Sequence, residues 1–202
     1  MSKKVIAIVG SYRKGKIIDT AVSAILDGAK ARGGQTEKIY LLDKHIEFCT
    51  NCRKCTQEKE AGKRAKCIHN DDMDEILQKI DEADGVVFGA PVNYYNVTAI
   101  MRRFIERLLP YGYWPWGKKE TPKYRIKKPT KKAVILTSSA CPAFFGRIFM
   151  PGAMGVLKIA AKSMGAKVVM SLYFGMAGVE EGQQLSKKDL LKAYKAGEKL
   201  VS

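Results

Sequence analysis

Residues 5–16 read Val-Ile-Ala-Ile-Val-Gly-Ser-Tyr-Arg-Lys-Gly-Lys, and this stretch decides the fold. Its first five residues are apolar and mostly β-branched, which is typical of a strand that is buried on both faces. Polar and basic residues follow, and residues 19–32 then place apolar side chains at helical spacing until Gly33-Gly34 stops the pattern. The chain therefore opens with a buried strand, a short basic loop and a helix.

Strands and helices continue to alternate along the rest of the chain. Right-handed crossovers turn repeated strand–helix units into a parallel sheet with helices on both faces. Ligands bind such sheets at the carboxyl ends of the strands, so the loops after the first, third and fourth strands should form one site. We expect further strands at residues 37–42, 85–89, 133–137 and 167–173, and further helices at residues 71–83, 97–108, 151–164 and 186–200.

Length and composition suit one compact α/β domain over residues 1–202. Hydrophobic residues make up 46% of the chain, and the formal net charge is +16. This excess fits an anionic partner such as nucleic acid or lipid headgroups, and it equally fits a surface that attracts anionic cofactors and substrates. No nucleic-acid motif accompanies the charge, so we expect no nucleic-acid partner.

The sequence contains no targeting or spanning pattern. No apolar run approaches the roughly 20 residues of a membrane span, so we expect no membrane partner. The first residues lack the cleavage pattern of a signal peptide and run directly into the first strand. We therefore expect a cytoplasmic protein, whose cysteines are thiols or metal ligands rather than disulfides.

The loop after the first strand has the chemistry of a phosphate site. It matches neither the G-x-G-x-x-G of dinucleotide folds nor the G-K-[ST] end of a P-loop. Hydroxyl, guanidinium and backbone N–H donors at a helix N-terminus nevertheless bind phosphate well. We expect Ser11 and Arg13 to be phosphate ligands, with Gly15, Lys16 and Thr20 beside them. A surface turn with ordinary basic residues is the alternative.

Two further loops carry groups that suit a flat ring with a polar edge. The loop after the third strand offers a proline and aromatic wall together with amide groups, and the loop after the fourth offers small residues with hydroxyls. A rigid turn with Asn96 or Thr98 as the helix N-cap is compatible with the first of these roles. The candidate ring contacts are Pro91, Val92, Asn93, Tyr94, Tyr95, Ser138, Ser139 and Ala140.

Together these loops resemble the NAD(P)H-dependent FMN reductase family of flavodoxin-like proteins, over essentially the whole chain. Family members commonly read G-S-P-R-x-x-G-N-T after the first strand, where this chain has Gly10-Ser11-Tyr12-Arg13. The resemblance implies a flavodoxin-like three-layer α/β fold with a five-stranded parallel sheet of order 2-1-3-4-5. It also implies FMN as the cofactor, NAD(P)H as co-substrate and a homodimer or homotetramer.

The phosphate loop departs from the family pattern in two ways. Tyr12 replaces proline, and Lys16-Ile17-Ile18-Asp19-Thr20 suggests a two-residue insertion before the threonine. Asp19 then stands where asparagine is usual. A carboxylate near a phosphate is unfavourable unless it faces away and supports the helix start.

Four of the five cysteines lie in the long charged connection at residues 43–69. Cys49, Cys52 and Cys55 form a Cys-x2-Cys-x2-Cys motif, and Cys67 follows after eleven residues. The pattern indicates a metal or cluster site, and it resembles the iron–sulfur flavoproteins, whose compact motif holds a [4Fe–4S] cluster near FMN. Those proteins keep a shorter gap to the fourth cysteine, so we favour thiols without a metal. A [4Fe–4S] cluster and a zinc site remain the alternatives.

The favoured function is an FMN-dependent oxidoreductase that passes electrons from NAD(P)H to a small acceptor such as a flavin or quinone. No general acid or base is assigned, because in such enzymes the protein supplies position and electronics to the cofactor. The alternative is an electron-transfer flavoprotein, with or without the cluster, and nucleic-acid binding rests on the charge alone. The aromatic segment at residues 110–117 either covers the flavin of a neighbouring subunit or packs as a local hydrophobic cluster.

Overall fold

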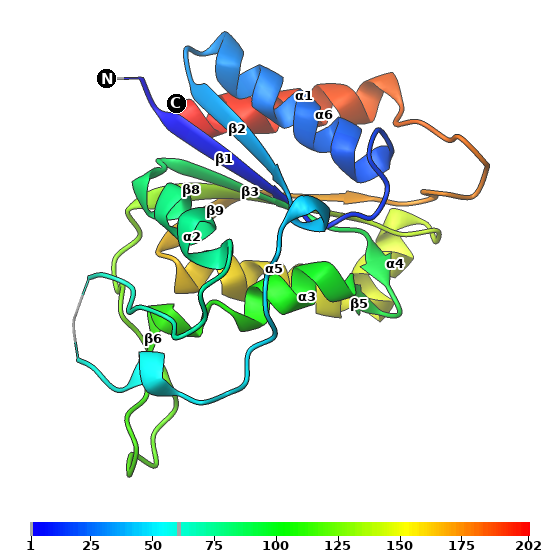
Figure 1. Ribbon diagram of the computed structural model, residues 1–202. Coiled ribbons are helices and arrows are strands. Elements are labelled where there is room, and N and C mark those ends of the chain that lie inside the picture. The colour runs from blue at the N-terminus through cyan, green and yellow to red at the C-terminus, as the bar shows by residue number, and fades with distance from the viewer. Residues whose placement is uncertain (1, 60–61) are drawn as a thin grey trace.

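The computed structural model describes residues 2–59 and 62–202, and its centre is a five-stranded parallel sheet (Figure 1). Neighbouring strands all pair in parallel, in the order β2-β1-β3-β8-β9. Numbered along the chain, this is the order 2-1-3-4-5, so the expected sheet is confirmed. The strands are β1 (Lys4–Val9), β2 (Gln35–Tyr40), β3 (Gly85–Gly89), β8 (Lys131–Ser138) and β9 (Ala166–Phe174).

Helices cover both faces of the sheet and produce three layers (Figure 1). Alternate residues of the buried strands supply two separate cores, with Val9 on the side of the first helix pair and Ile8 on the other side. Burial on both faces explains why the strands read as continuous apolar runs. One face carries α1 (Ile17–Ala31) and α6 (Lys187–Val201), and the other carries α2 (Met73–Glu82), α3 (Ala99–Glu106) and α5 (Pro151–Ser163).

Two elements beside the strand ends differ from the expectation. The helix expected over residues 97–108 begins only at Ala99, because β4 (Val92–Asn93) and β5 (Asn96–Val97) form a hairpin before it. Thr98 is its N-cap and accepts a hydrogen bond from the backbone N–H of Met101. An additional helix, α4 (Ala143–Phe149), escapes the expected pattern because its large apolar side chains face outward instead of forming a buried stripe. Among the described residues no single helix could cross a bilayer by length and composition, although α4 and α5 taken together, bent by 73°, pass that test.

The aromatic segment at residues 110–117 packs on the cysteine-bearing connection of the same chain. It contains η3 (Leu109–Tyr111) and β6 (Gly112–Tyr113), which pairs with β7 (Lys123–Tyr124). The Arg53 guanidinium lies 3.5 Å from the ring centre of Trp114 and 3.9 Å from that of Trp116. These contacts favour the local cluster over a cover for another subunit's flavin. The remaining short helices are η1 (Leu41–Asp43), which shortens the expected second strand, and η2 (Lys54–Thr56).

A close contact between α1 and α6 depends on glycine. A Cβ atom on Gly28 would lie 2.0 Å from the carbonyl oxygen of Tyr194, and one on Gly197 would lie 1.8 Å from the carbonyl oxygen of Ile25. Backbone atoms cannot move aside as a flexible side chain can, so any side chain at these positions would force the helices apart. The contact thus fixes how closely α1, which begins directly after the first loop, packs on α6.

We expect Gly197→Ala to destabilise the fold by at least about 2 kcal/mol, because the new methyl group would overpack a backbone contact. The matched control is Gly155→Ala in α5, where no atom lies within 4 Å of the position of a Cβ. That substitution should stabilise the protein by up to about 1 kcal/mol, because alanine favours a helix interior. Urea denaturation of both variants measures the difference, and equal effects would contradict the role given to Gly197.

Candidate active site

A cleft of about 310 Å³ opens at the carboxyl ends of four neighbouring strands. The loops after β1, β3 and β8 line it, as the sequence predicts, and the loop after β9 completes it. Its lining consists of Ser11, Tyr12, Arg13, Lys16, Ile17, Ile18, Pro91, Val92, Asn93, Thr98, Ser138, Ser139, Ala140, Ala177, Gly178 and Gln183.

Most of the expected site residues belong to this lining, and four do not. The Thr20 hydroxyl donates to the carbonyl oxygens of Lys16 and Ile17 within its own helix, so the geometry does not support a phosphate contact there. Tyr94 and Tyr95 occupy the tip of the β4–β5 hairpin, with positive φ angles of 47° and 64°, and their side chains are exposed. Gly15 also lies outside the lining, with φ at 71°.

The loop after β9 is the part of the cleft that sequence reasoning missed. The Gln183 side chain organises it by accepting hydrogen bonds from the backbone N–H groups of Gly178 and Val179, at 2.8 and 2.9 Å. The same side chain donates to the Met176 carbonyl oxygen at 2.6 Å. The parallel topology could have predicted this loop at the cleft, because the fifth strand of the sheet ends at the same edge as the others.

One end of the cleft carries cations that have no partner in the chain. The Ser11 hydroxyl accepts a hydrogen bond from the Arg13 backbone N–H at 3.2 Å and shapes the turn. Within residues 2–59 and 62–202, no hydrogen bond or ion pair engages the side-chain charge of Arg13 or Lys16. No side chain caps the N-terminus of α1, which leaves its first N–H groups open beside these cations. Groups of this kind at a helix N-terminus suit a doubly charged anion such as a phosphate monoester.

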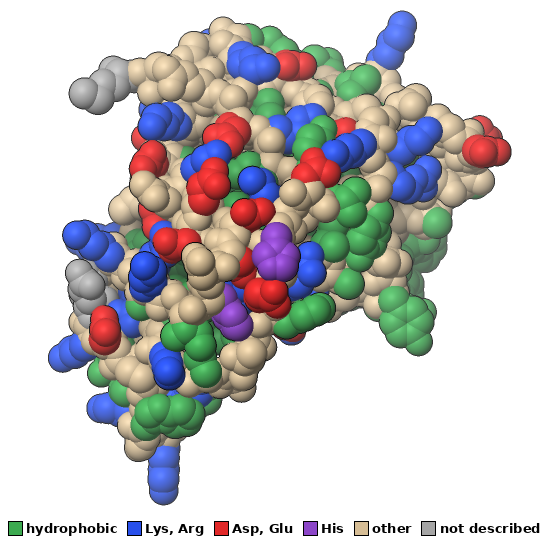
Figure 2. Space-filling view, in the orientation of Figure 1, with side chains coloured by type: hydrophobic (Ala, Val, Ile, Leu, Met, Phe, Trp, Pro, Cys, Tyr) green, Lys and Arg blue, Asp and Glu red, His purple; other side chains and the backbone are tan. Residues whose placement is uncertain are grey.

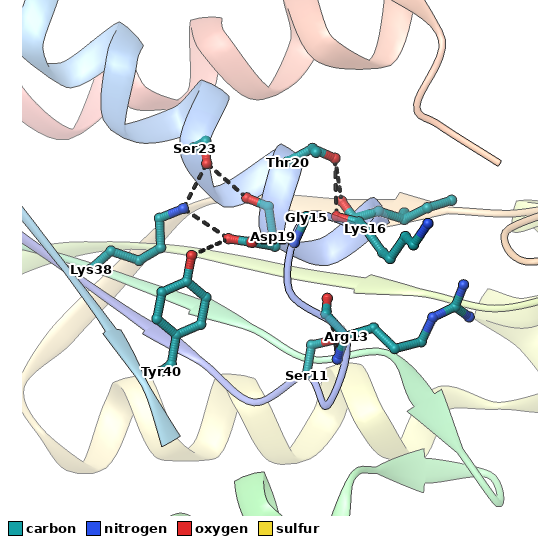
Figure 3. Close-up of polar contacts among 10 residues, drawn as sticks. Ser11, Arg13, Gly15, Lys16, Asp19, Thr20, Ser23, Lys38 and Tyr40 are labelled. Carbon is teal, nitrogen blue, oxygen red and sulfur yellow. Dashed lines mark hydrogen bonds and ion pairs between the residues drawn. The ribbon is translucent and has the colours of Figure 1, made fainter. Parts of the chain in front are cut away.

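Asp19 faces away from these cations and anchors the loop to β2 (Figure 3). Its carboxylate accepts hydrogen bonds from the Gly15 backbone N–H at 2.6 Å, the Lys38 Nζ at 2.8 Å and the Tyr40 hydroxyl at 2.9 Å. Burial alone would raise the pKa of Asp19, but these hydrogen bonds outweigh it and hold the pKa below the usual carboxyl value. Lys38 on β2 therefore balances the negative charge of Asp19, and the carboxylate supports the start of α1 through Gly15.

The other end of the cleft combines apolar walls with buried hydroxyls. The Thr98 hydroxyl donates to the Gly10 carbonyl oxygen at 2.5 Å and so ties the loop after β3 to the loop after β1. The Ser139 hydroxyl accepts a hydrogen bond from the buried Tyr173 hydroxyl at 3.0 Å. Pro91 and Val92 lie beside these groups in the lining. Such a surface suits a flat ring system with hydrogen-bonding edges.

The cysteines of the long connection come together outside this cleft. Burial and then the charges of the other three thiols, those of Cys49, Cys52 and Cys67, raise the pKa of Cys55 to about 11. Arg107, whose side chain is 1% exposed, forms a buried ion pair with Asp71 and donates to Cys67 Sγ at 3.6 Å. Across the described part of the chain, no group of three or more His, Cys, Asp and Glu residues has the geometry to hold a metal ion. The thiols as arranged therefore do not form a ready metal site.

The sheet order and the cleft at the carboxyl ends of the strands define a flavodoxin-like α/β protein. The model of the NADPH-dependent FMN reductase family matches residues 3–126, more than half of the chain. The chain therefore belongs to the NADPH-dependent FMN reductase family. Family membership identifies FMN as the cofactor.

Individual relatives share part of the sequence with this chain, and solved structures share its fold. The chain is 38% identical over 112 residues to an iron-sulfur flavoprotein of Archaeoglobus fulgidus, covering 55% of this chain and 48% of the relative. The chain thus spans about half the length of the curated relatives it matches. Among solved structures, it resembles the NAD(P)H:quinone oxidoreductase from Methanothermobacter marburgensis with a TM-score of 0.71 and 18% identity, over 99% and 100% of the two chains. An FMN-dependent NADH-azoreductase from Bacillus anthracis in complex with FMN gives a TM-score of 0.67 and 15% identity, over 98% and 97%.

We expect Asp19→Asn to reduce the free energy of unfolding by about 1–3 kcal/mol near neutral pH, because the partly buried Lys38 loses its ion pair. The pKa of Asp19 is lowered in the folded protein, so its contribution is complete above the ordinary carboxyl pKa and is lost as the pH falls through the folded pKa. Wild type and variant should therefore differ by a constant amount from about pH 5 to 8 and converge below about pH 4.

Asp43→Asn is the control for this prediction, since the Lys14–Asp43 pair is about half exposed on both sides. It should cost less than about 1 kcal/mol. Denaturant titrations at several pH values make the comparison. If Asp19→Asn cost no more than Asp43→Asn at pH 7, the anchoring role of Asp19 would be wrong.

Proposed function

We propose that this protein is an FMN-dependent oxidoreductase that passes electrons from NAD(P)H to a small acceptor such as a flavin or quinone. The observation that carries the proposal is the pairing, in one cleft, of unpartnered cations at a helix N-terminus with an apolar, hydroxyl-bearing surface. FMN has this polarity, with one phosphate at one end and a flat ring at the other. Family membership supports the same assignment.

The chemistry of the cleft residues supports FMN as the ligand. Ser11, Arg13 and Lys16, with the open N–H groups of α1, would hold the phosphate. The ring would lie against Pro91 to Asn93 on one side and Ser138 to Ala140 on another. No adenosine-binding fingerprint accompanies the loop, which supports FMN rather than FAD.

When bound, FMN supplies the redox chemistry by accepting a hydride and delivering electrons to a second substrate. The chain contributes orientation, because hydrogen bonds within the chain already fix Thr98 and Ser139. Asp19 fixes the loop after β1 by accepting a hydrogen bond from the Gly15 backbone N–H. The cleft lining holds no carboxylate and no histidine, in keeping with a reaction that needs no general acid–base pair from the protein. A homodimer or homotetramer in the cytoplasm remains part of this proposal.

The cysteines favour a second candidate, an electron-transfer flavoprotein that carries an iron–sulfur cluster. The observations behind it are that four thiols occupy one neighbourhood and that the curated relatives are named iron-sulfur flavoproteins. The guanidinium of Arg107 on Cys67 Sγ and the eleven-residue gap before Cys67 speak against it. Spectroscopy separates the two candidates directly.

We expect the purified protein to release FMN on heating, and Arg13→Ala to weaken FMN binding by about 1.5–3 kcal/mol, the usual contribution of a charged hydrogen bond. Chromatography of the released flavin identifies it, and titration of apoprotein by flavin fluorescence quenching gives the dissociation constant. Arg32→Ala is the control, because Arg32 is exposed and pairs with Glu198 away from the cleft. FAD as the sole flavin, or equal affinities for the two variants, would overturn the site.

We expect anaerobically purified protein to contain flavin without stoichiometric iron. Entropy alone does not decide this outcome, because a longer loop closes at only about 0.6 kcal/mol more for each doubling of its length. The reason is instead the arrangement of the thiols, among which Cys67 already accepts a hydrogen bond from the buried Arg107. Iron and acid-labile sulfide assays make the measurement. About four of each per chain, with absorbance near ~400 nm that dithionite bleaches, would establish the cluster and favour the electron-transfer candidate.

A further inference from the structure

A chain of two hydroxyl groups ends at the apolar, hydroxyl-bearing end of the cleft. The Tyr173 hydroxyl donates a hydrogen bond to the Ser139 hydroxyl oxygen at 3.0 Å, and each residue is only 6% exposed. Ser139 belongs to the lining of the cleft, whereas Tyr173 lies behind it on β9 and does not. The tyrosine hydroxyl can therefore act on a bound ligand only through the serine.

The helix α4 covers the Tyr173 hydroxyl with backbone instead of a side chain. A Cβ atom on Gly146 would lie 2.1 Å from the hydroxyl oxygen and 2.5 Å from the ring carbon that bears it, so α4 and β9 are in close contact here. The larger side chains of α4, such as Phe145, point outward, and Figure 2 shows hydrophobic side chains on the right-hand side of the molecule, where Figure 1 labels α4. The tyrosine hydroxyl is thus shielded from water, which leaves Ser139 as its hydrogen-bond acceptor.

The end of β9 and the loop after it also hold the backbone of Ser139. The Ser139 N–H donates to the Phe174 carbonyl oxygen at 3.0 Å, and the Ser139 carbonyl oxygen accepts from the Ala177 N–H at 2.8 Å. Together with the hydrogen bond from Tyr173, these contacts fix the backbone and the side-chain oxygen of the serine from one neighbouring segment of chain. The hydroxyl of Ser139 therefore has a defined position in the cleft before any ligand binds.

The hydrogen of the Ser139 hydroxyl lacks a strong acceptor among the residues that the structure describes. Its neighbours are the Cys141 carbonyl oxygen and the Cys141 Sγ, each at 3.3 Å. O–H···O hydrogen bonds are normally 2.5–3.0 Å long, and a thiol sulfur is a weak acceptor. The hydrogen is therefore available to a ligand in the cleft, and a hydroxyl that already accepts one hydrogen bond is a stronger donor in the next.

We propose that Tyr173 is a positioning residue that orients and polarises the Ser139 hydroxyl as a donor to the polar edge of the flavin ring. The inference rests on the proposed function, in which FMN occupies the cleft. A hydride from NAD(P)H brings two electrons and one proton to FMN and leaves NAD(P)⁺, so the reduced ring gains one negative charge. A donor at the polar edge stabilises that charge more than it stabilises the oxidised ring. The pair of hydroxyls therefore raises the midpoint potential of bound FMN and favours its reduction by NAD(P)H.

Spectroelectrochemical titration of the FMN-loaded full chain at one fixed pH tests the proposal. Tyr173→Phe removes a single oxygen atom, and we expect it to lower the affinity for reduced relative to oxidised FMN about three- to tenfold. For a two-electron couple this corresponds to a fall of about 15–30 mV in the midpoint potential. Ser139→Ala should lower the potential at least as much. Because the tyrosine acts through the serine, adding Tyr173→Phe to Ser139→Ala should cause no further fall.

Tyr111→Phe is the matched control, because the Tyr111 hydroxyl is also buried and donates to Asp81 Oδ1 at 2.6 Å outside the cleft. This variant should lower the melting temperature and leave the potential of bound FMN unchanged. An unchanged or raised potential in Tyr173→Phe would overturn the role of the tyrosine while the protein still bound and reduced FMN. A further fall on adding Tyr173→Phe to Ser139→Ala would overturn its action through the serine. Wild-type protein that bound no FMN would overturn the proposed function itself, and this inference with it.

Discussion

The in-register carboxyl edge of the sheet is the constraint on which the rest of the structure depends. Val9 pairs with Tyr40 on one side and with Gly89 on the other, and Gly89 pairs with Leu136. The hydrogen bonds continue one residue beyond each strand, from Gly10 N to Gly89 O, from Ala90 N to Leu136 O and from Ser139 N to Phe174 O. Loops that are far apart in the sequence therefore leave the sheet at one level. The cleft forms because these loops begin at the same level of the sheet. A shift in the register of one strand would move the loop after β1 away from the loops after β3 and β8.

Buried carboxylates hold the loop after β1 and the cysteine-bearing connection at residues 43–69 in place. Asp19 accepts from the Gly15 backbone and from Lys38, and Asp71 accepts from the Glu47 backbone and from Arg107. For both groups burial opposes ionisation, but hydrogen bonds and the neighbouring cation lower the pKa further than burial raises it. Each carboxylate thus links a loop amide to a cation on another element. This arrangement shapes the loop after β1 and orders the cysteine-bearing connection.

Sequence reasoning was most successful where burial in the hydrophobic core determines the structure. The strands at residues 5–9 and 85–89 are buried on both faces, so their composition alone identified them and the order of loops around the cleft. It failed where tertiary contacts decide. Nothing local in Ala143–Phe149 shows that Gly146 will meet Tyr173, and nothing local in Gln183 shows that its amide will close the last loop. Thr20 was expected near the phosphate from its place at the helix start, and its hydroxyl donates to carbonyl oxygens of its own first turn.

The distribution of partners, rather than the total charge, determines what a cationic surface can bind. Lys38, Arg64 and Arg107 are engaged by carboxylates within the fold, and these cations have little attraction left for a ligand. Arg13 and Lys16 at the cleft, and Arg147 and Lys158 on the outer helices, contribute to the same net charge of +16 but have no such partner in the described chain. Composition cannot distinguish these groups, because a pairing between distant residues is created only by the fold. These four cations fall into two separate sets, one in a narrow cleft and one on α4 and α5. An isolated phosphate suits the first set, because its cations lie within one cleft.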